Sequence, residues 1–307
     1  MRKDRLGAPA IVLLLVVSLA IGGQQTAVKF AAEGAPPVLM AALRAGAAAS
    51  CLALWAWVRG IALFRRDGTL AYGLAIGVTG AAQFSLLFVG LEFTTAARAT
   101  VFLYAAPFII AAGAHVLVPG ERMRRSQFAG MAVAFLGVVA AFAGRLFGAA
   151  EAGPEGLIGD AIAFAAAFAW AGTILIVRLG PLIRGSAVRT LFYQMAFSLP
   201  CLLLVSLALG ERWTVVPSAR ALFGFAYLVL AVVCFGFVTW VTLLSRYPAA
   251  QIAAYSFLTP VFGVAAGALV LGETLSLDLL AGLALVSAGI CCVSAPSRDE
   301  SRSRAPN

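Results

Sequence analysis

The side chains that could carry chemistry in this chain are few, and most of them are embedded in long apolar runs. Arg44 is the clearest example, because it lies about seven residues inside such a run. A charged group in hydrocarbon costs roughly 2.5–3.5 kcal/mol on insertion scales, so it usually faces the interior of a helix bundle. There a guanidinium can hold the carboxylate or phosphate of a bound molecule, or it can bind main-chain carbonyls between helices. The sequence leaves both interpretations of Arg44 open.

Neutral polar and aromatic residues within the same kind of run are candidates for lining a binding site. We select Gln24, Gln83, Tyr104, Trp170, Gln194, Trp240 and Tyr255. The amides are candidates because a polar group inside hydrocarbon needs a partner. The aromatic residues are candidates for the wall of a cavity, although such residues more often pack between helices or face the lipid.

Two titratable groups are candidates for proton coupling or gating. Asp160 follows Gly159 at the start of an apolar run, where a carboxylate either stabilises the helix start or relays protons. His115 is the only histidine, and imidazole titrates near neutral pH, but its place near the end of a run is also typical of an interfacial hydrogen-bonding residue. Glu121 and Glu273 lie in matching turns, and we assign them to stabilisation of the turn and of the helix start.

The composition shows which elements must position these residues. The chain has 307 residues, of which 62% are hydrophobic and 11% charged, whereas a soluble domain is about 45–50% apolar and about 25% charged. A membrane-spanning helix needs roughly 20 mostly apolar residues, so the chain has room for about ten spans. The runs are rich in Ala and Leu and lack the alternation of barrel strands, which predicts an all-α membrane protein.

Breaks in the apolar runs predict the ten spans. They cover about Pro9–Val28, Pro37–Val58, Thr69–Gly90, Ala96–Val118, Gln127–Ala143, Leu157–Val177, Val188–Leu209, Ala221–Leu244, Ala249–Leu271 and Leu277–Val293. The first run resembles a secretory signal, but many spans follow it, so we expect an uncleaved first helix. Most Lys and Arg fall in the connections on the N-terminal side, which predicts that both termini lie in the cytoplasm.

The chain also repeats itself. Pro107 and Pro260 are 153 residues apart, while Gly120-Glu121, Gly130 and Gly137 recur 152 residues later as Gly272-Glu273, Gly282 and Gly289. The repeat predicts two units, residues 1–148 and 149–307, of five helices each. Five is an odd number, so the second unit enters the membrane from the opposite side, as in the inverted repeats of secondary transporters. The two prolines would kink their helices at matched positions, which are candidate hinge points.

These residues resemble a known family, the drug/metabolite transporter superfamily, in its EamA-type ten-helix members. The resemblance covers nearly the whole chain and rests on the two repeated Pro, Gly-Glu, Gly, Gly blocks, on Arg44 and on the region of Trp170. It implies secondary transport of small metabolites such as amino acids, with efflux or exchange driven by protons or by the counter-substrate. In the first helix, Ile21-Gly22-Gly23-Gln24 replaces the Trp-Gly that is frequent in the family, so an aromatic wall of the cavity is expected to be missing there.

The sequence lacks the residues that other classes of protein function require. The only lysines are Lys3 and Lys29, so no phosphate-binding loop is present and ATP-driven pumping by this chain is excluded. One histidine and one embedded aspartate do not suit an enzyme or a metal site, and no cofactor is expected. The scattered basic residues indicate topology rather than nucleic-acid binding. The expected partners are a small-molecule substrate, protons and the lipid bilayer of a bacterial cytoplasmic membrane. The alternative function is that of a structural or regulatory membrane subunit, and the sequence does not indicate the oligomeric state.

Overall fold

The computed structural model describes residues 6–65, 67–94, 96–119, 121–141, 154–216, 218–271 and 277–294, and every regular element within these ranges is a helix. The helices are α1 (Ala8–Gly22), α2 (Gln24–Ala32), α3 (Pro37–Val58), α4 (Thr69–Phe93), α5 (Ala96–Leu103), α6 (Ala106–Leu117), α7 (Arg125–Ala141), α9 (Pro154–Leu179), η1 (Pro181–Arg184), α10 (Ala187–Ala208), α11 (Ala219–Tyr227), η2 (Leu228–Phe237), α12 (Val238–Arg246), α13 (Ala249–Tyr255), α14 (Leu258–Leu271) and α15 (Leu277–Ser294).

Seven helical stretches in the described residues are long and apolar enough to cross a membrane. They are Ala8–Ala32, Pro37–Val58, Thr69–Phe93, Arg98–Leu117, Gly156–Leu179, Ala187–Ala208 and Ala219–Arg246. Two further apolar helices, Arg125–Ala141 and Ala281–Val293, are shorter. The all-α prediction is therefore confirmed, whereas the count of ten crossings stays a prediction.

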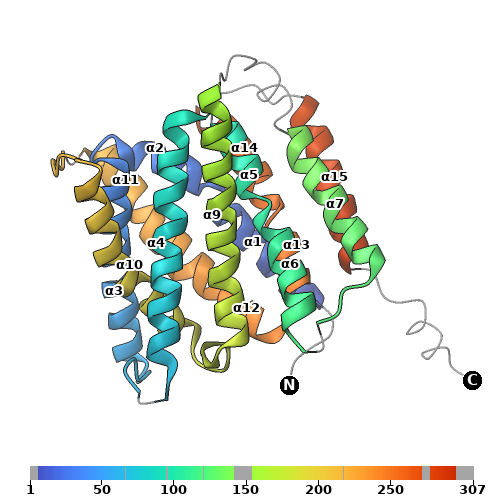
Figure 1. Cartoon of the computed structure of the whole chain (residues 1–307), viewed down its shortest axis with the longest axis horizontal. Coiled ribbons are helices and arrows are strands. Elements are labelled where there is room, and N and C mark those ends of the chain that lie inside the picture. Colours follow the sequence, from blue (N-terminus) through green and yellow to red (C-terminus); the bar gives the residue numbers. More distant parts are fainter. Residues whose placement is uncertain are drawn as a thin grey trace, which may run out of the picture.

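The helices stand side by side as a bundle (Figure 1), and α1 begins at the same end of it as α15 finishes. We call this the lower end, as drawn in Figure 1, and the opposite one the upper end. Small residues let the helices approach closely, as is typical of packing in lipid. On α3, for instance, Ala41, Ala45 and Ala48 are buried, while Leu54 and Trp57 are exposed to the surroundings of the bundle.

The two repeats interleave rather than forming separate lobes. Helix α4 of the first unit packs along α9 of the second, and α2 of the first packs along α11 of the second. Since α4 is the third predicted span of its unit and α9 the first of the other, these two contacts correspond to each other under the repeat. Corresponding helices of the two units also pack together, α3 with α10 and α7 with α15.

The repeated glycines form the contact between α7 and α15. A methyl group added at Gly130 would lie 2.8 Å from the carbonyl oxygen of Gly289, and one added at Gly137 would lie 2.7 Å from that of Gly282. Each unit thus supplies two glycines that face the other unit's two glycines in antiparallel order. The spacing of seven residues in both repeats follows from this pairing, because two helical turns separate the two contact points.

Three of the ten spans predicted from the sequence are interrupted part-way. The first breaks at Gly23 between α1 and α2, the fourth at Tyr104–Ala105 between α5 and α6, and the ninth at Ser256–Phe257 between α13 and α14. Two of these turns come shortly before Pro107 and Pro260, whose rings cannot continue the hydrogen-bond ladder of the preceding turn. At both turns the backbone stays in the right-handed helical region, at Ala105 and at Ser256, so the matched prolines accompany local interruptions of their helices.

Candidate functional site

Arg44 lies on the inward face of α3 and has 3% of its surface exposed. Its guanidinium carbon lies 4.3 Å from the centre of the Phe84 ring on α4, within cation–π range. Its Nε atom is buried and has no hydrogen-bond partner. Within the described residues no carboxylate faces it, so Arg44 is a buried cation held by an aromatic ring.

Among the described residues, two other buried polar side-chain atoms have no hydrogen-bond partner. They are the Oε1 of Gln24, the first residue of α2, and the Oγ of Ser85, which follows Phe84 on α4. Helix α3 packs against both α2 and α4. Buried polar groups in native proteins are nearly always hydrogen-bonded, so orphaned ones point to a missing partner.

A second group of candidate residues gathers at the helix breaks. The rings of Tyr104 and Trp170 meet edge to face, with centroids 5.7 Å apart. Tyr255 is buried, and its main-chain carbonyl accepts a 3.2 Å hydrogen bond from the Ser18 hydroxyl of α1. The breaks at Tyr104 and at Tyr255 thus face elements of the other unit.

The remaining candidates are dispersed. Gln194 of α10 lies against Gly80 of α4, and Gln83 is half-buried one turn further along α4. Trp240 of α12 packs, partly buried, against the largest core cluster. The structure therefore brings Tyr104 and Trp170 together directly, whereas Gln194 belongs to a helix contact between α4 and α10.

Asp160 is not placed at a helix start as the sequence suggested. Helix α9 begins at Pro154, so Asp160 lies beyond its first turn. Its carboxylate forms an ion pair with Arg98 and accepts hydrogen bonds from the Arg98 Nε at 3.2 Å and from the Thr94 hydroxyl at 2.8 Å. These contacts join α9 to the start of α5 near the upper end, and they supply the counter-charge for a buried carboxylate.

His115 is engaged near the lower end. Its Nδ1 accepts a 2.7 Å hydrogen bond from the main-chain amide of Met123, and its ring meets that of Phe128 edge to face at 5.7 Å. With Nδ1 accepting this bond, the ring is tied to the connection between α6 and α7.

Glu121 takes part in a buried network at the lower end. It forms an ion pair with Arg178 at the end of α9, and its other oxygen accepts a 2.8 Å hydrogen bond from the amide of Ala249, the first residue of α13. Arg178 also donates to the carbonyls of Leu244 and Tyr247. The carboxylate thus stabilises the start of α13 rather than that of α7, and the pair ties together segments of both units.

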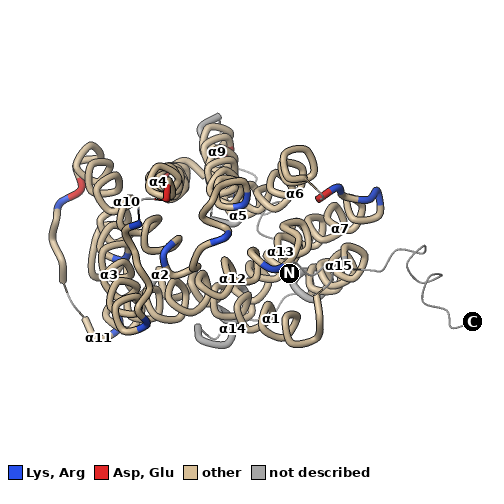
Figure 2. Tube along the Cα trace, turned by 90° about the horizontal axis from the view of Figure 1, so that it is seen from below, with Lys and Arg blue, Asp and Glu red and all other residues tan. Residues whose placement is uncertain are grey.

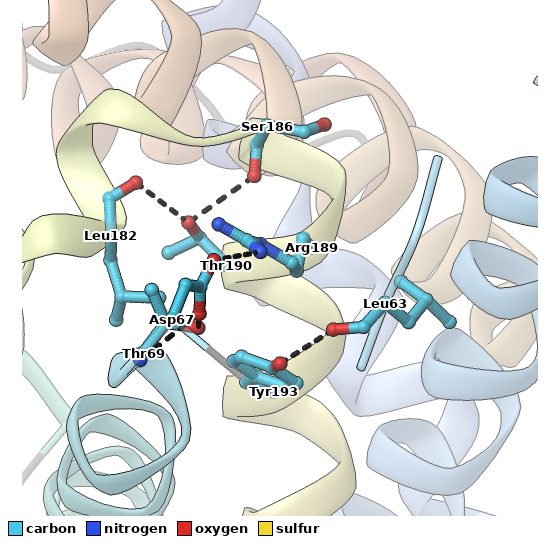
Figure 3. A network of polar contacts seen from close by, with 8 residues as sticks. All are labelled: Leu63, Asp67, Thr69, Leu182, Ser186, Arg189, Thr190 and Tyr193. Atoms are coloured by element: carbon cyan, nitrogen blue, oxygen red, sulfur yellow. Dashed lines mark hydrogen bonds and ion pairs between the residues drawn. The ribbon is translucent and has the colours of Figure 1, made fainter. Parts of the chain in front are cut away.

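Figure 3 shows a further network of polar contacts, centred on Arg189 near the start of α10. Arg189 donates a 2.7 Å hydrogen bond to Asp67, which also accepts one of 2.6 Å from the Thr69 hydroxyl. Hydrogen bonds from Thr69 and Arg189 lower the pKa of Asp67 from 3.8 to about 2. Tyr193 donates to the carbonyl of Leu63 in the same connection (Figure 3).

The upper end has a corresponding contact made by Glu211. Its carboxylate accepts hydrogen bonds from the amides of Val38 at 3.0 Å and Leu39 at 2.8 Å, in the first turn of α3. Each unit's connection between its second and third spans therefore binds the start of the other unit's second span. Seen from below, most of the Lys and Arg residues in view are scattered over the helix ends and connections rather than forming one patch (Figure 2).

Known proteins are similar to this chain over nearly its whole length. A family model described as "EamA-like transporter family" matches residues 8–143 and again residues 157–295, one match for each repeat. The chain belongs to the EamA-like transporter family. It is accordingly a multi-pass membrane protein of the transporter class, and the resemblance noted from its sequence is confirmed.

Curated relatives agree with this membership. One from Salmonella typhimurium, named "Probable amino-acid metabolite efflux pump", is 34% identical over 230 residues, covering 72% of this chain and 74% of the relative. A protein of the same name from Escherichia coli K12 is 31% identical and covers 91% of this chain and 92% of the relative. The "Uncharacterized transporter YvbV" of Bacillus subtilis is 25% identical, covering 88% of this chain and 86% of its own length.

The fold also matches a solved structure. A chain titled "Crystal structure of protein" superposes with a TM-score of 0.77 at 22% identity, covering 94% of this chain and 97% of the other. At this identity the match supports the fold alone.

Sequence reasoning missed Ser85 and Phe84, and it did not predict the ion pairs of Asp160 with Arg98 and of Glu121 with Arg178. A serine or phenylalanine in an apolar run carries no signal by itself, and only the neighbouring Arg44 distinguishes this pair. Glu273 lies outside the described residues. Within the described residues no group of three His, Cys, Asp or Glu side chains could hold a metal ion.

Proposed function

We propose that this EamA-family protein is a secondary active transporter that moves amino acids or related small metabolites out of the bacterial cytoplasm by alternating access. The observation that carries the proposal is the buried guanidinium of Arg44, which no described carboxylate neutralises. A buried charge without a partner is costly, so a structural role alone does not account for it. The names of the two relatives above support the amino-acid class and the outward direction.

The proposed topology has ten crossings with both ends in the cytoplasm. Helix α7, the α13–α14 pair and α15 would supply the three crossings that add to the seven long apolar stretches. The shared end of α1 and α15 supports an even number of crossings (Figure 1). With this orientation the lower end is cytoplasmic, where Arg178 and Arg189 agree with the preference of Lys and Arg for that side.

Alternating access needs contacts that differ between two states. The pair of Arg178 and Glu121 joins the lower ends of α9, α12 and α13, so its rupture would be required to open the site toward the cytoplasm. The interleaved packing of the two units supports a rocking motion about their shared interface. Asp160 and His115, the two candidates for proton coupling, are each engaged in contacts within the protein. Neither residue therefore distinguishes proton coupling from exchange, and both are proposed as driving forces.

A flux assay tests this function. Purified protein is reconstituted into liposomes preloaded with labelled amino acids and organic acids, and release is followed with and without a pH gradient. We expect saturable release of at least one compound from wild-type liposomes, and a large loss with Arg44→Gln. Absence of saturable flux for every compound under both conditions would contradict the proposal and favour a structural subunit.

A further inference from the structure

In the part of the chain that the structure describes, three buried side-chain atoms have no hydrogen-bond partner: the Nε of Arg44, the Oε1 of Gln24 and the Oγ of Ser85. The first belongs to a cation and donates. The second only accepts, and the hydroxyl can do either. An unsatisfied buried donor or acceptor costs about 1–3 kcal/mol, so three of them in one region form a set that a ligand would complete.

The three atoms lie at one level of the bundle. Arg44 comes seven residues after Pro37, at which α3 begins near the upper end, a rise of about 10 Å. Gln24 and Ser85 come eight residues before Ala32 and Phe93, at which α2 and α4 end near the same face, a rise of about 12 Å. Helix α3 contacts both α2 and α4, and the guanidinium of Arg44 reaches the ring of Phe84, the residue before Ser85.

Phe84 holds the cation ready for a ligand. Its ring lies 4.3 Å from the guanidinium carbon, and a ring face attracts a cation without occupying its hydrogen-bonding edge. The fork of N–H donors thus stays available for a planar acceptor. A carboxylate offers two oxygens in the geometry that such a fork binds best.

We propose that Arg44, Ser85 and Gln24 form a binding site for the zwitterionic head group of an α-amino acid. The carboxylate is held by the guanidinium of Arg44 and the hydroxyl of Ser85, and the ammonium donates to the Oε1 of Gln24. This assignment deepens the proposed transport function and rests on it. It adds Ser85 as a specificity-determining residue and assigns each pole of the ligand to a separate side chain.

The Oε1 acceptor of Gln24 distinguishes an α-amino acid from a simple anion. A phosphate or a dicarboxylate would satisfy Arg44 but would leave the Gln24 oxygen without a donor, a loss that sites built for polar ligands penalise strongly. A cationic ligand would in turn face the unneutralised guanidinium. A molecule that carries a carboxylate and a hydrogen-bond donor on neighbouring groups completes all three, and an α-amino acid does so with a charged group at each pole.

Ligand binding to detergent-purified protein tests the site without requiring flux. The proteinogenic L-amino acids are screened by thermal shift, and the Kd of the strongest binder is compared with those of its carboxamide and N-acetyl forms. We expect both modified forms to bind about tenfold to hundredfold more weakly, which is the range for losing a charged hydrogen bond. Arg44→Lys and Ser85→Ala should weaken binding of the amino acid more than binding of its carboxamide, while Gln24→Leu should weaken binding of the amino acid more than binding of its N-acetyl form.

Arg220→Lys is the matched control, because Arg220 also lies over a ring, that of Phe30 at 4.2 Å, but is exposed. It should bind as the wild type does. Size-exclusion chromatography and the unliganded melting temperature establish that each variant is folded, and Arg44→Lys keeps the charge if Arg44→Gln does not fold. The assignment would be overturned if all three variants weakened binding of the amino acid, its carboxamide and its N-acetyl form equally, or if no amino acid bound. Saturable flux of other metabolites would then still support a transporter.

Discussion

At the scale of residues, the buried arginines differ in what neutralises them. Arg178 faces Glu121 and two main-chain carbonyls, and Arg189 faces Asp67, whereas among the described residues Arg44 has the ring of Phe84 and no carboxylate. A paired arginine has a structural explanation in its own contacts. An arginine with a ring alone does not, and for this reason Arg44 carries the functional argument.

Removing Arg178 should destabilise the fold. Arg178→Leu deletes the charge that Glu121 faces in a pair whose side chains are 4% and 2% exposed. Breaking a buried pair from one side costs about 3–5 kcal/mol, so we expect a clearly lower melting temperature in detergent. The double variant Glu121→Gln with Arg178→Met should recover part of the loss, and an unchanged melting temperature of Arg178→Leu would contradict the buried pair.

The contact between Asp67 and Arg189 should depend on pH. The pKa of Asp67 is lowered from 3.8 to about 2 in the folded protein, so its stabilisation is fully present above pH 3.8 and is lost as the pH falls through about 2. The melting temperature of the wild type should exceed that of Asp67→Asn at pH 5, and the difference should shrink by pH 3. A difference that grows on acidification would be inconsistent with the lowered pKa.

The sequence identified Arg44 and Gln24 because charge and amide groups are rare in apolar runs. It could not pair Arg98 with Asp160, or Arg178 with Glu121, because those partners come from separate helices and only packing brings them together. Ser85 was missed for a related reason: a serine in a membrane helix usually bonds to its own backbone, and its free hydroxyl appears only in the structure.

At the scale of elements, the repeated glycines make a sharp prediction about the contact of α7 with α15. A methyl group at Gly137 would lie 2.6 Å from the amide nitrogen of Val286, so Gly137→Ala forces two backbones apart. Overpacking of this kind costs about 1–3 kcal/mol, and the melting temperature should fall accordingly. Gly172→Ala on α9 is the matched control, because nothing lies within 4 Å of its added methyl group and the change should be neutral.

Spacing in the sequence located these glycines and the matched prolines, but it did not show how each acts. The glycines of one repeat meet those of the other, a contact that a search within one repeat does not reveal. The prolines accompany local interruptions of their helices, and the interruption at Gly23 has no proline beside it. There the Tyr227 hydroxyl donates a 2.9 Å hydrogen bond to the freed carbonyl of Ala20, so a tertiary contact stabilises the interruption.

At the scale of the whole molecule, the proposed topology predicts which connections face the outside. Val215, between α10 and α11, and Arg65, between α3 and α4, are both exposed and lie toward opposite ends of the bundle. In a variant without the native cysteines, Val215→Cys should react with a membrane-impermeant maleimide added to intact cells, whereas Arg65→Cys should react only after lysis. Labelling of both from outside, or the reverse pattern, would exclude cytoplasmic termini.

The all-helical architecture and the two repeats were predictable because apolar runs and repeated motifs are properties of the chain itself. The interleaving of α4 with α9 and of α2 with α11 was not, since it depends on how two homologous surfaces fit together. That interleaving places the Arg44 region inside one bundle shared by both units, which is what a carrier with one central site requires.

The most direct measurement is the accessibility of Ser85 from the two sides of the membrane. A Ser85→Cys variant without the native cysteines is treated with an impermeant thiol reagent in right-side-out and in inside-out vesicles, with and without the amino acid that binds most strongly. Alternating access to the proposed site predicts labelling from both sides and protection by the amino acid in each case. Labelling from one side only, or labelling that the amino acid does not slow, would contradict a central site that opens to each face in turn.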